Sequence, residues 1–153
     1  MCRRYIGDET KSKDVLQDSF IRIFKSFKNY DADKGSLAGW MRKITVNMAL
    51  RSLSKKNLEI SALTVDFNEK FSIAPEIAQK LNHDDLLKVV MTLPEGYRQV
   101  FNLSVIEGYS HKEISEMLDI KEVSSRSNLS RAKQILRNKL TALKNSDRWT
   151  KIV

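Results

Sequence analysis

The sequence of 153 residues predicts an all-α protein made of two small helical domains joined by a linker. Only five glycines and two prolines leave little turn chemistry for a fold of many strands. Apolar residues instead recur at helical spacing in two parts of the chain, and residues 57–82 between them show no sustained period. We therefore expect a first domain over residues 1–56, a linker over 57–83, a second domain over 84–145 and a C-terminal tail over 146–153.

Charge is distributed in blocks along the chain. Residues 1–56 hold 13 Lys/Arg against six Asp/Glu, residues 57–88 hold three against six, and residues 89–153 hold 11 against seven. Two basic blocks around an acidic stretch indicate two modules that touch one polyanion, with a connecting segment that is not attracted to it. A simple role in solubility is the alternative for the net charge of +8.

Several classes of protein are disfavoured by what the sequence lacks. No stretch approaches the roughly 20 apolar residues of a membrane span, and the N-terminus has no apolar core of a secretory signal, so no membrane insertion is expected. The lone cysteine, Cys2, fits a reducing cytosol and predicts a cytoplasmic protein. His83 and His111 are isolated, which disfavours a zinc site, and no phosphate-binding loop or nucleophile elbow occurs. We expect no enzyme activity, metal, cofactor or small-molecule substrate.

The first domain should begin with a helix over residues 14–29. Its apolar positions recur at a helical period and are expected to face inward: Val15, Leu16, Phe20, Ile23, Phe24 and Phe27. The other face carries Asp14, Gln17, Asp18, Arg22, Lys25 and Lys28. Residues 29–36, rich in Asp and Gly, then predict a turn.

A second helix is predicted from an N-cap at Ser36 to about residue 56. Two apolar stripes are expected on it, one made of Leu37, Trp40, Met41, Ile44 and Met48 and the other of Val46, Leu50 and Leu53. Between the stripes, Lys43, Asn47 and Arg51 stand at i, i+4 and i+8 and form one polar ridge. From the pattern alone, this ridge is interpreted as solvated, and Trp40 as a core residue.

The second domain should start with an amphipathic helix near Asp84, because acidic residues favour a helix N-terminus. Pro94 predicts the first turn of the next helix, and Gly108 predicts its end. Ser110 and Glu113 then have the spacing of a capping box for a short helix that stops near Asp119.

The last predicted helix is longer and basic. Its inward face is expected to hold Ser125, Leu129, Ala132, Leu136 and Leu140. Left toward solvent are Arg126, Ser127, Asn128, Ser130 and Arg131. A short helix, a tight turn and a longer helix rich in Arg, Ser and Asn are typical of a helix-turn-helix, although any amphipathic helical hairpin could imitate the pattern.

Two stretches together resemble the sigma-70 family, specifically its extracytoplasmic-function (ECF) group of bacterial transcription initiation factors. "DVLQDSFIRIFKSFKNYDADKGSLAGWMRKITVNMALRSLSKK", residues 14–56, is similar to the family's region two. "LPEGYRQVFNLSVIEGYSHKEISEMLDIKEVSSRSNLSRAKQILRNKL", residues 93–140, is similar to region four. The resemblance implies a protein that binds core RNA polymerase and directs it to promoter DNA. The alternative is a stand-alone helix-turn-helix regulator.

For region two, the resemblance implies two kinds of contact. Four residues fall where the family docks on the β′ coiled coil of the polymerase: Asp14, Gln17, Asp18 and Arg22. The residues that fall where the family contacts the −10 element are Asp33, Lys34, Gly35 and Ser36 in the turn and Lys43, Asn47 and Arg51 on the ridge. With the resemblance, the ridge is interpreted as a surface for the opened DNA strand rather than as merely solvated.

For region four, the resemblance implies −35 contacts. The residues that correspond to the recognition face are Arg126, Ser127, Asn128, Ser130 and Arg131. Lys112, Lys121, Lys133 and Arg137 are assigned to phosphates. Further partners typical of the group are the β flap of the polymerase and an anti-sigma factor.

The sequence departs from the family pattern in two places. The family usually has another helix before residues 1–8, so we expect either that the first helix of region two is truncated here or that the start of the sequence is placed too far downstream. In the turn of the helix-turn-helix, Asp119, Lys121 and Val123 stand where the family commonly has glycine, serine and glycine. Asp119 can adopt the left-handed conformation, whereas the loss of a capping serine at Lys121 should cost about 1 kcal/mol unless Asp119 substitutes for it.

Overall fold

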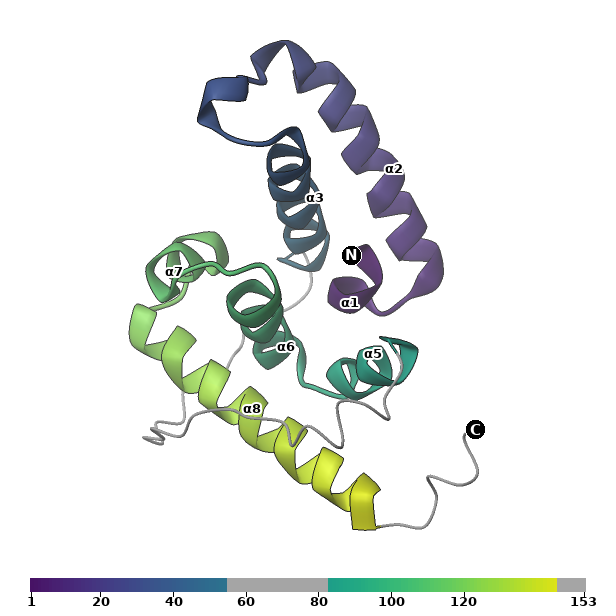
Figure 1. Ribbon diagram of the computed structural model, residues 1–153, viewed down its shortest axis with the longest axis vertical. Helices are drawn as coiled ribbons and strands as arrows, with labels where there is room; N and C mark the ends of the chain where they lie inside the picture. Colours follow the sequence, from purple (N-terminus) through teal and green to yellow (C-terminus); the bar gives the residue numbers. More distant parts are fainter. Residues whose placement is uncertain (55–82, 146–153) are drawn as a thin grey trace. The chain divides into compact units, whose positions relative to one another are not determined.

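The computed structural model describes residues 1–54 and 83–145, and these residues form helices and turns without any strand. They belong to two compact units, the first holding α1 to α3 and the second α5 to α8 (Figure 1). The predicted all-α fold is therefore confirmed for the part of the chain that is described. The predicted linker, apart from residue 83, and the predicted tail lie outside these residues.

The first unit is a helical hairpin closed at one end by a short helix. α2 (Glu9–Ser26) and α3 (Leu37–Ser54) lie side by side, joined through two single turns, η1 (Phe27–Asn29) and η2 (Ala32–Lys34). α1 (Cys2–Ile6) packs against both long helices at the end away from these turns (Figure 1). α1 was not predicted from the spacing of apolar residues, and its Tyr5 is fully buried.

The start of α2 also differs from the prediction. It lies five residues before the expected position, because Asp8 caps the helix by accepting a hydrogen bond from the Lys11 backbone N–H at 2.8 Å. Ser36, in contrast, accepts from the Gly39 N–H at 3.2 Å, as expected for the N-cap of α3.

The inward face of α2 is rotated from the predicted one. Its buried residues are Ser12, Val15, Ser19 and Ile23. Leu16, Phe20, Phe24 and Phe27 are exposed, so the expectation that they face inward is wrong. Small serines allow close approach to the neighbouring helices. Each serine hydroxyl donates a hydrogen bond to a backbone carbonyl one turn earlier, and that from Ser19 to the Val15 carbonyl is 2.6 Å long.

The predicted stripes of α3 differ in burial. In the second stripe Val46 is fully buried and Leu50 is 7% exposed, and Thr45 and Ala49 are buried beside them. The first stripe is half-buried at most, and Leu37 at its beginning is exposed. The core of the first unit is therefore formed on the side of α3 around Val46 rather than on both stripes.

The second unit contains α5 (His83–Met91), α6 (Glu95–Phe101), a π turn η3 (Asn102–Ile106), α7 (His111–Leu118) and α8 (Glu122–Asn145). The long α8 packs against the three other helices (Figure 1). Its predicted inward face is confirmed, since Ser125, Leu129, Ala132, Leu136 and Leu140 are all buried. The partners of this face in the core of the unit include Leu93, Val100, Leu103, Ile114 and Leu118.

Helix ends in the second unit follow the sequence signals closely. Pro94 is the N-cap residue of α6, and Gly108 has a φ of 81° after η3. The capping box of α7 is present, with Ser110 accepting from the Glu113 N–H and the Glu113 carboxylate accepting from the Ser110 N–H at 2.8 Å. Asp119 has a φ of 53° and ends α7 in the left-handed conformation, as predicted. The left-handed Asp119 at the end of α7 sets the direction in which the chain continues into α8.

Candidate nucleic-acid interface

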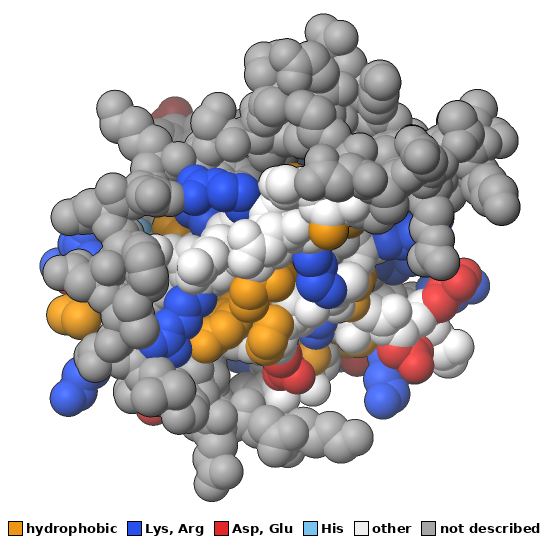
Figure 2. Space-filling view, turned by 90° about the horizontal axis from the view of Figure 1, so that it is seen from below, with side chains coloured by type: hydrophobic (Ala, Val, Ile, Leu, Met, Phe, Trp, Pro, Cys, Tyr) orange, Lys and Arg blue, Asp and Glu red, His pale blue; other side chains and the backbone are white. Residues whose placement is uncertain are grey.

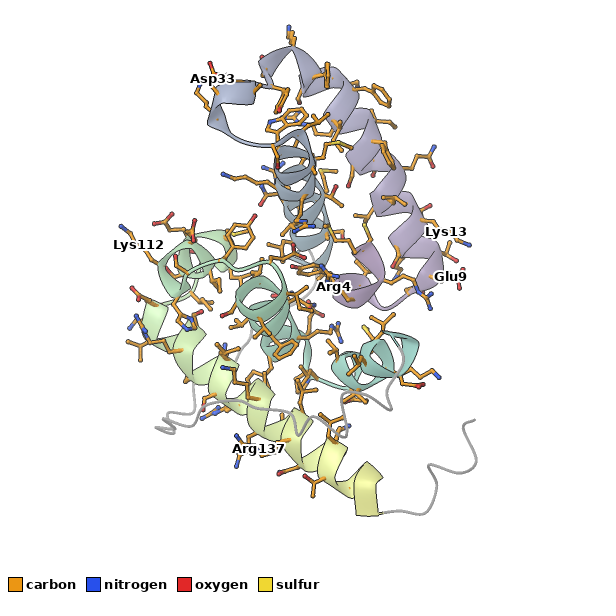
Figure 3. All side chains as sticks on the ribbon, viewed as in Figure 1. Arg4, Glu9, Lys13, Asp33, Lys112 and Arg137 are labelled. Carbon is orange, nitrogen blue, oxygen red and sulfur yellow. The ribbon has the colours of Figure 1, made fainter. Side chains whose placement is uncertain are left out.

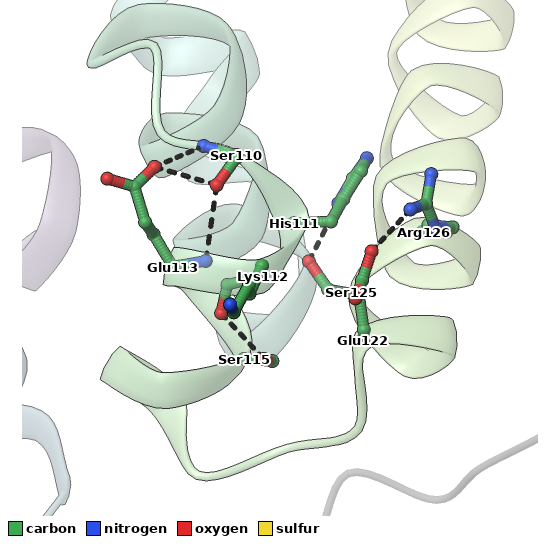
Figure 4. Close-up of polar contacts among 8 residues, drawn as sticks. All are labelled: Ser110, His111, Lys112, Glu113, Ser115, Glu122, Ser125 and Arg126. Carbon is green, nitrogen blue, oxygen red and sulfur yellow. Dashed lines mark hydrogen bonds and ion pairs between the residues drawn. The ribbon is translucent and has the colours of Figure 1, made fainter.

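The first turns of α8 carry an exposed arginine. The Arg126 side chain is 61% exposed and forms an ion pair with Glu122 one turn earlier on the same helix (Figure 4). Such a pair between exposed side chains contributes only about 0.3–0.5 kcal/mol to a helix. Arg126 therefore remains available for another anionic or acceptor group.

Arg131, one turn and a half further along α8, is held differently. It is half-buried, and its Nη1 donates a hydrogen bond to the Tyr97 hydroxyl of α6 at 3.2 Å. Between the two arginines, Ser127 and Ser130 are half-buried, and the Ser127 hydroxyl donates to the Ser124 carbonyl at 3.0 Å. Four of the five predicted recognition residues thus reach the surface to some degree.

Asn128 does not reach the surface, and the expectation that it faces solvent is wrong. Its side chain is 4% exposed. The reason is its register: Asn128 lies three residues after Ser125 and four before Ala132, which places it on the inward face of α8. We therefore assign Asn128 to the packing of α8 against the rest of its unit.

His111 connects α7 to α8. Its Nδ1 lies 2.9 Å from the hydroxyl of Ser125, which is fully buried at the start of α8 (Figure 4). Burial lowers the pKa of His111, repulsion by Arg126 and Lys133 lowers it further, and Glu122 opposes the change. No local sequence pattern signals this contact, because its two residues are 14 positions apart in the chain.

The predicted phosphate-binding cations of this unit differ in exposure. Lys112 and Lys121 are exposed, whereas Lys133 and Arg137 are half-buried. The side chains of Lys112 and Arg137 point outward from α7 and α8 (Figure 3). Figure 2 shows basic side chains separated by apolar ones over one face. Separate cations can each meet one phosphate, which suits a polymer with regularly spaced charges.

In the first unit, the predicted turn has a defined shape. The Asp31 carboxylate accepts from the Asp33 N–H at 3.0 Å and pairs with Lys34 at 3.1 Å. The Tyr30 hydroxyl donates to the Gly35 carbonyl at 3.1 Å, and Gly35 has a φ of 138° that favours glycine. The predicted site residues of the turn are all exposed: Asp33, Lys34, Gly35 and Ser36.

An aromatic cluster lies beside this turn. The rings of Phe27, Tyr30 and Trp40 have centroids 5.6–6.4 Å apart. Trp40 is half-buried within the cluster, so the prediction that it is a core residue holds only in part. Such rings offer flat apolar surface close to an exposed polar turn.

The polar ridge of α3 and the polar face of α2 are both accessible. Lys43 and Arg51 are exposed on α3, and Asn47 between them is half-buried. On α2 the predicted polymerase-binding residues are all exposed: Asp14, Gln17, Asp18 and Arg22. A face that carries both signs of charge suits a complementary protein partner.

Two further features bear on the kind of site. Within the described ranges, no three His, Cys, Asp or Glu side chains come together as a metal site would require. No described helix is both long and apolar enough to cross a membrane.

Two family models match the chain, one for each unit. The model described as "Sigma-70 region 2" matches residues 1–59, and the model described as "Sigma-70, region 4" matches residues 83–136. Together they cover most of the chain, in the same order as the two helical units.

Curated proteins similar to this chain carry related descriptions. The "ECF RNA polymerase sigma factor SigE" of Mycolicibacterium smegmatis is 32% identical over 143 residues, which are 90% of this chain and 54% of that protein. The Bacillus subtilis factors SigW and SigM are 24% and 27% identical, over 94% and 88% of this chain and 82% and 85% of their own lengths. The chain therefore spans about half the length of the first relative and most of the other two.

Proposed function

The chain belongs to the ECF group of the sigma-70 family, and we propose that it binds core RNA polymerase and directs it to specific promoters. Sigma factors are not enzymes, so the phosphoryl transfer of RNA synthesis is left to the polymerase. The observation that supports the proposal is the presence of both regions, in the family's order, in one chain.

The second unit would read the −35 element as duplex DNA. Arg126 and Arg131 can each donate two hydrogen bonds to a guanine, and a good pair of this kind contributes about 1–3 kcal/mol of discrimination. Ser127 and Ser130 add hydroxyls that donate or accept. The phosphates on either side would be met by Lys112, Lys121, Lys133 and Arg137. The buried Asn128 contributes no base contact in this scheme.

The first unit would hold the −10 element after the strands open. Asn47 can hydrogen-bond a base edge, while Lys43 and Arg51 neutralise phosphates. The turn residues Asp33, Lys34, Gly35 and Ser36 would receive a base that has left the stack. Unstacking a base costs a few kcal/mol, so a surface that captures it promotes opening without ATP.

The polymerase itself would be held mainly by α2. Asp14, Gln17, Asp18 and Arg22 would dock on the β′ coiled coil, and the second unit would meet the β flap. We assign region two to residues 1–56 and region four to residues 84–145, joined by a linker and followed by a short tail. Because core RNA polymerase acts in the cytoplasm of bacteria, we propose the same location for this protein, with an anti-sigma factor as a further partner.

Reconstituted transcription tests the proposal directly. Core polymerase alone and core polymerase with this protein are compared on promoters recovered by selecting DNA that the reconstituted enzyme binds. We expect specific initiation only when the protein is present. A stand-alone regulator would instead bind duplex DNA tightly without polymerase, and such binding, with no gain of initiation, would contradict the proposal.

A further inference from the structure

Arg131 is tied to a different helix from the one that carries it. Its guanidinium donates to the Tyr97 hydroxyl at 3.2 Å, and the two residues are 34 positions apart in the sequence. Tyr97 lies on α6 next to Gln99, Val100 and Phe101, which are all buried in the second unit. The backbone that carries the hydroxyl is therefore fixed by the core, so the hydroxyl marks a defined place relative to α8.

The contrast with Arg126 shows why this tie matters. The partner of Arg126 is Glu122, a carboxylate on the same helix, and both side chains are exposed. A carboxylate offsets part of the positive charge of the arginine, so the pair as a whole attracts a phosphate or a base acceptor less strongly than a free arginine does. The Tyr97 hydroxyl is neutral, so it orients Arg131 and leaves its full charge available.

A guanidinium has five N–H donors in a planar fork, and the Tyr97 hydroxyl takes one of them. Fixing one edge of the fork limits the rotamers that the arginine can adopt before DNA arrives. Side chains that are already ordered lose less entropy on binding, which is the general advantage of a preorganised contact. Tyrosine is suited to this role, because it has few rotatable bonds of its own.

We propose that Tyr97 is a positioning residue for promoter reading, whose hydroxyl holds the Arg131 guanidinium in the orientation that contacts a −35 base. This inference rests on the proposed function, because it requires α8 to lie in the major groove. It assigns a role to a residue of α6 that does not itself touch DNA. Part of the base specificity of α8 then depends on the packing between α6 and α8.

The test is Tyr97→Phe, which removes the hydroxyl and keeps the ring. Holoenzyme is reconstituted with the unmodified protein, Tyr97→Phe, Arg131→Ala and the double variant, and its affinity is measured for the selected promoter and for a set with single −35 substitutions. We expect Tyr97→Phe to lose about three- to tenfold in affinity for the selected promoter. Across the set of single −35 substitutions, Tyr97→Phe should reduce discrimination only at the base pair where Arg131→Ala also reduces it.

The double variant separates positioning from a general effect on folding. If Tyr97 acts through Arg131, adding Tyr97→Phe to Arg131→Ala should cause no further loss. Thr92→Val is a matched control, since it also removes a hydroxyl, one that donates to the Val89 carbonyl at 2.6 Å at the end of α5. It should leave promoter discrimination unchanged.

Three results would overturn the inference while leaving the proposed function intact. The first is that holoenzyme with Tyr97→Phe binds the promoter as tightly as holoenzyme with the unmodified protein. The second is that the losses of affinity add in the double variant, and the third is that Tyr97→Phe loses the same affinity on all promoter variants. An equal loss on all promoter variants is what the loss of a phosphate contact would cause, and that loss would also lower the salt dependence of binding. If the unmodified protein gives no promoter-specific initiation, the proposed function itself fails, and that outcome differs from all three.

Discussion

In the second unit, polar side chains of α8 are held by neighbouring helices, whereas in the first unit α2 leaves large apolar side chains exposed. Tyr97 of α6 holds Arg131, and His111 of α7 holds Ser125. On α2, in contrast, Phe24 is 77% exposed and Phe20 is 45% exposed. The difference is one of degree, because Val105 and Ile106 of the second unit are also exposed, but the bulky aromatic side chains on α2 leave apolar surface that a macromolecular partner could cover.

The largest expected effect contrasts a buried residue of the second unit with an exposed one of the first. Leu103 is fully buried, so Leu103→Ala should lower the free energy of unfolding by about 2–5 kcal/mol. Phe24→Ala should change it by no more than about 0.5 kcal/mol. Chemical denaturation followed by circular dichroism measures both. Equal destabilisation by the two variants would mean that Phe24 is packed, and the comparison would fail.

A smaller effect separates the two faces of the first unit. Asp18→Ala should weaken binding of core polymerase about five- to tenfold, equivalent to about 1 kcal/mol, because it removes a charge from the proposed docking face. Asn47→Ala should leave that affinity unchanged and slow the formation of open complexes. Fluorescence titration of core polymerase measures the first, and permanganate reactivity of opened thymines the second. If both variants weakened polymerase binding equally, the two faces would be misassigned.

The smallest effect concerns pH and the tie between α7 and α8. The pKa of His111 is lowered in the folded protein from an ordinary value of 6.5, because of burial and the nearby Arg126 and Lys133. The unfolded chain therefore binds a proton first as the pH falls, so the second unit should lose stability below about pH 6.5. Thermal unfolding between pH 7.5 and 5.5 measures the slope. His111→Gln should reduce it, and an unchanged slope would show that other groups cause it.

The sequence predicted those features of the fold that depend on neighbouring residues. The capping box at Ser110, the end of η3 before Gly108 and the left-handed Asp119 are local and follow from side-chain chemistry. The inward face of α8 was also predictable, because small and apolar residues recur along it at a regular spacing. In the candidate site, the exposure of Arg126 on α8 and of the polar face of α2 followed from the same spacing.

What the sequence did not predict depends on packing between distant elements. α2 buries two serines beside Val15 and Ile23 and leaves its phenylalanines exposed, because small side chains allow the neighbouring helices to approach closely. Asn128 is polar but is buried, because its position along α8 places it on the inward face of the helix. The tie between Tyr97 and Arg131 joins residues 34 positions apart, and no local pattern signals such a pair.

The central claim is that the two units act on different states of promoter DNA, one on duplex and one on opened strands. Initiation is therefore measured for Arg131→Ala and Asn47→Ala on a duplex promoter and on the same promoter opened beforehand by mismatches at −10. We predict that the opened template restores initiation by Asn47→Ala, because the cost of unstacking is already met, and does not restore initiation by Arg131→Ala. Equal rescue of both variants, or of neither, would contradict this account.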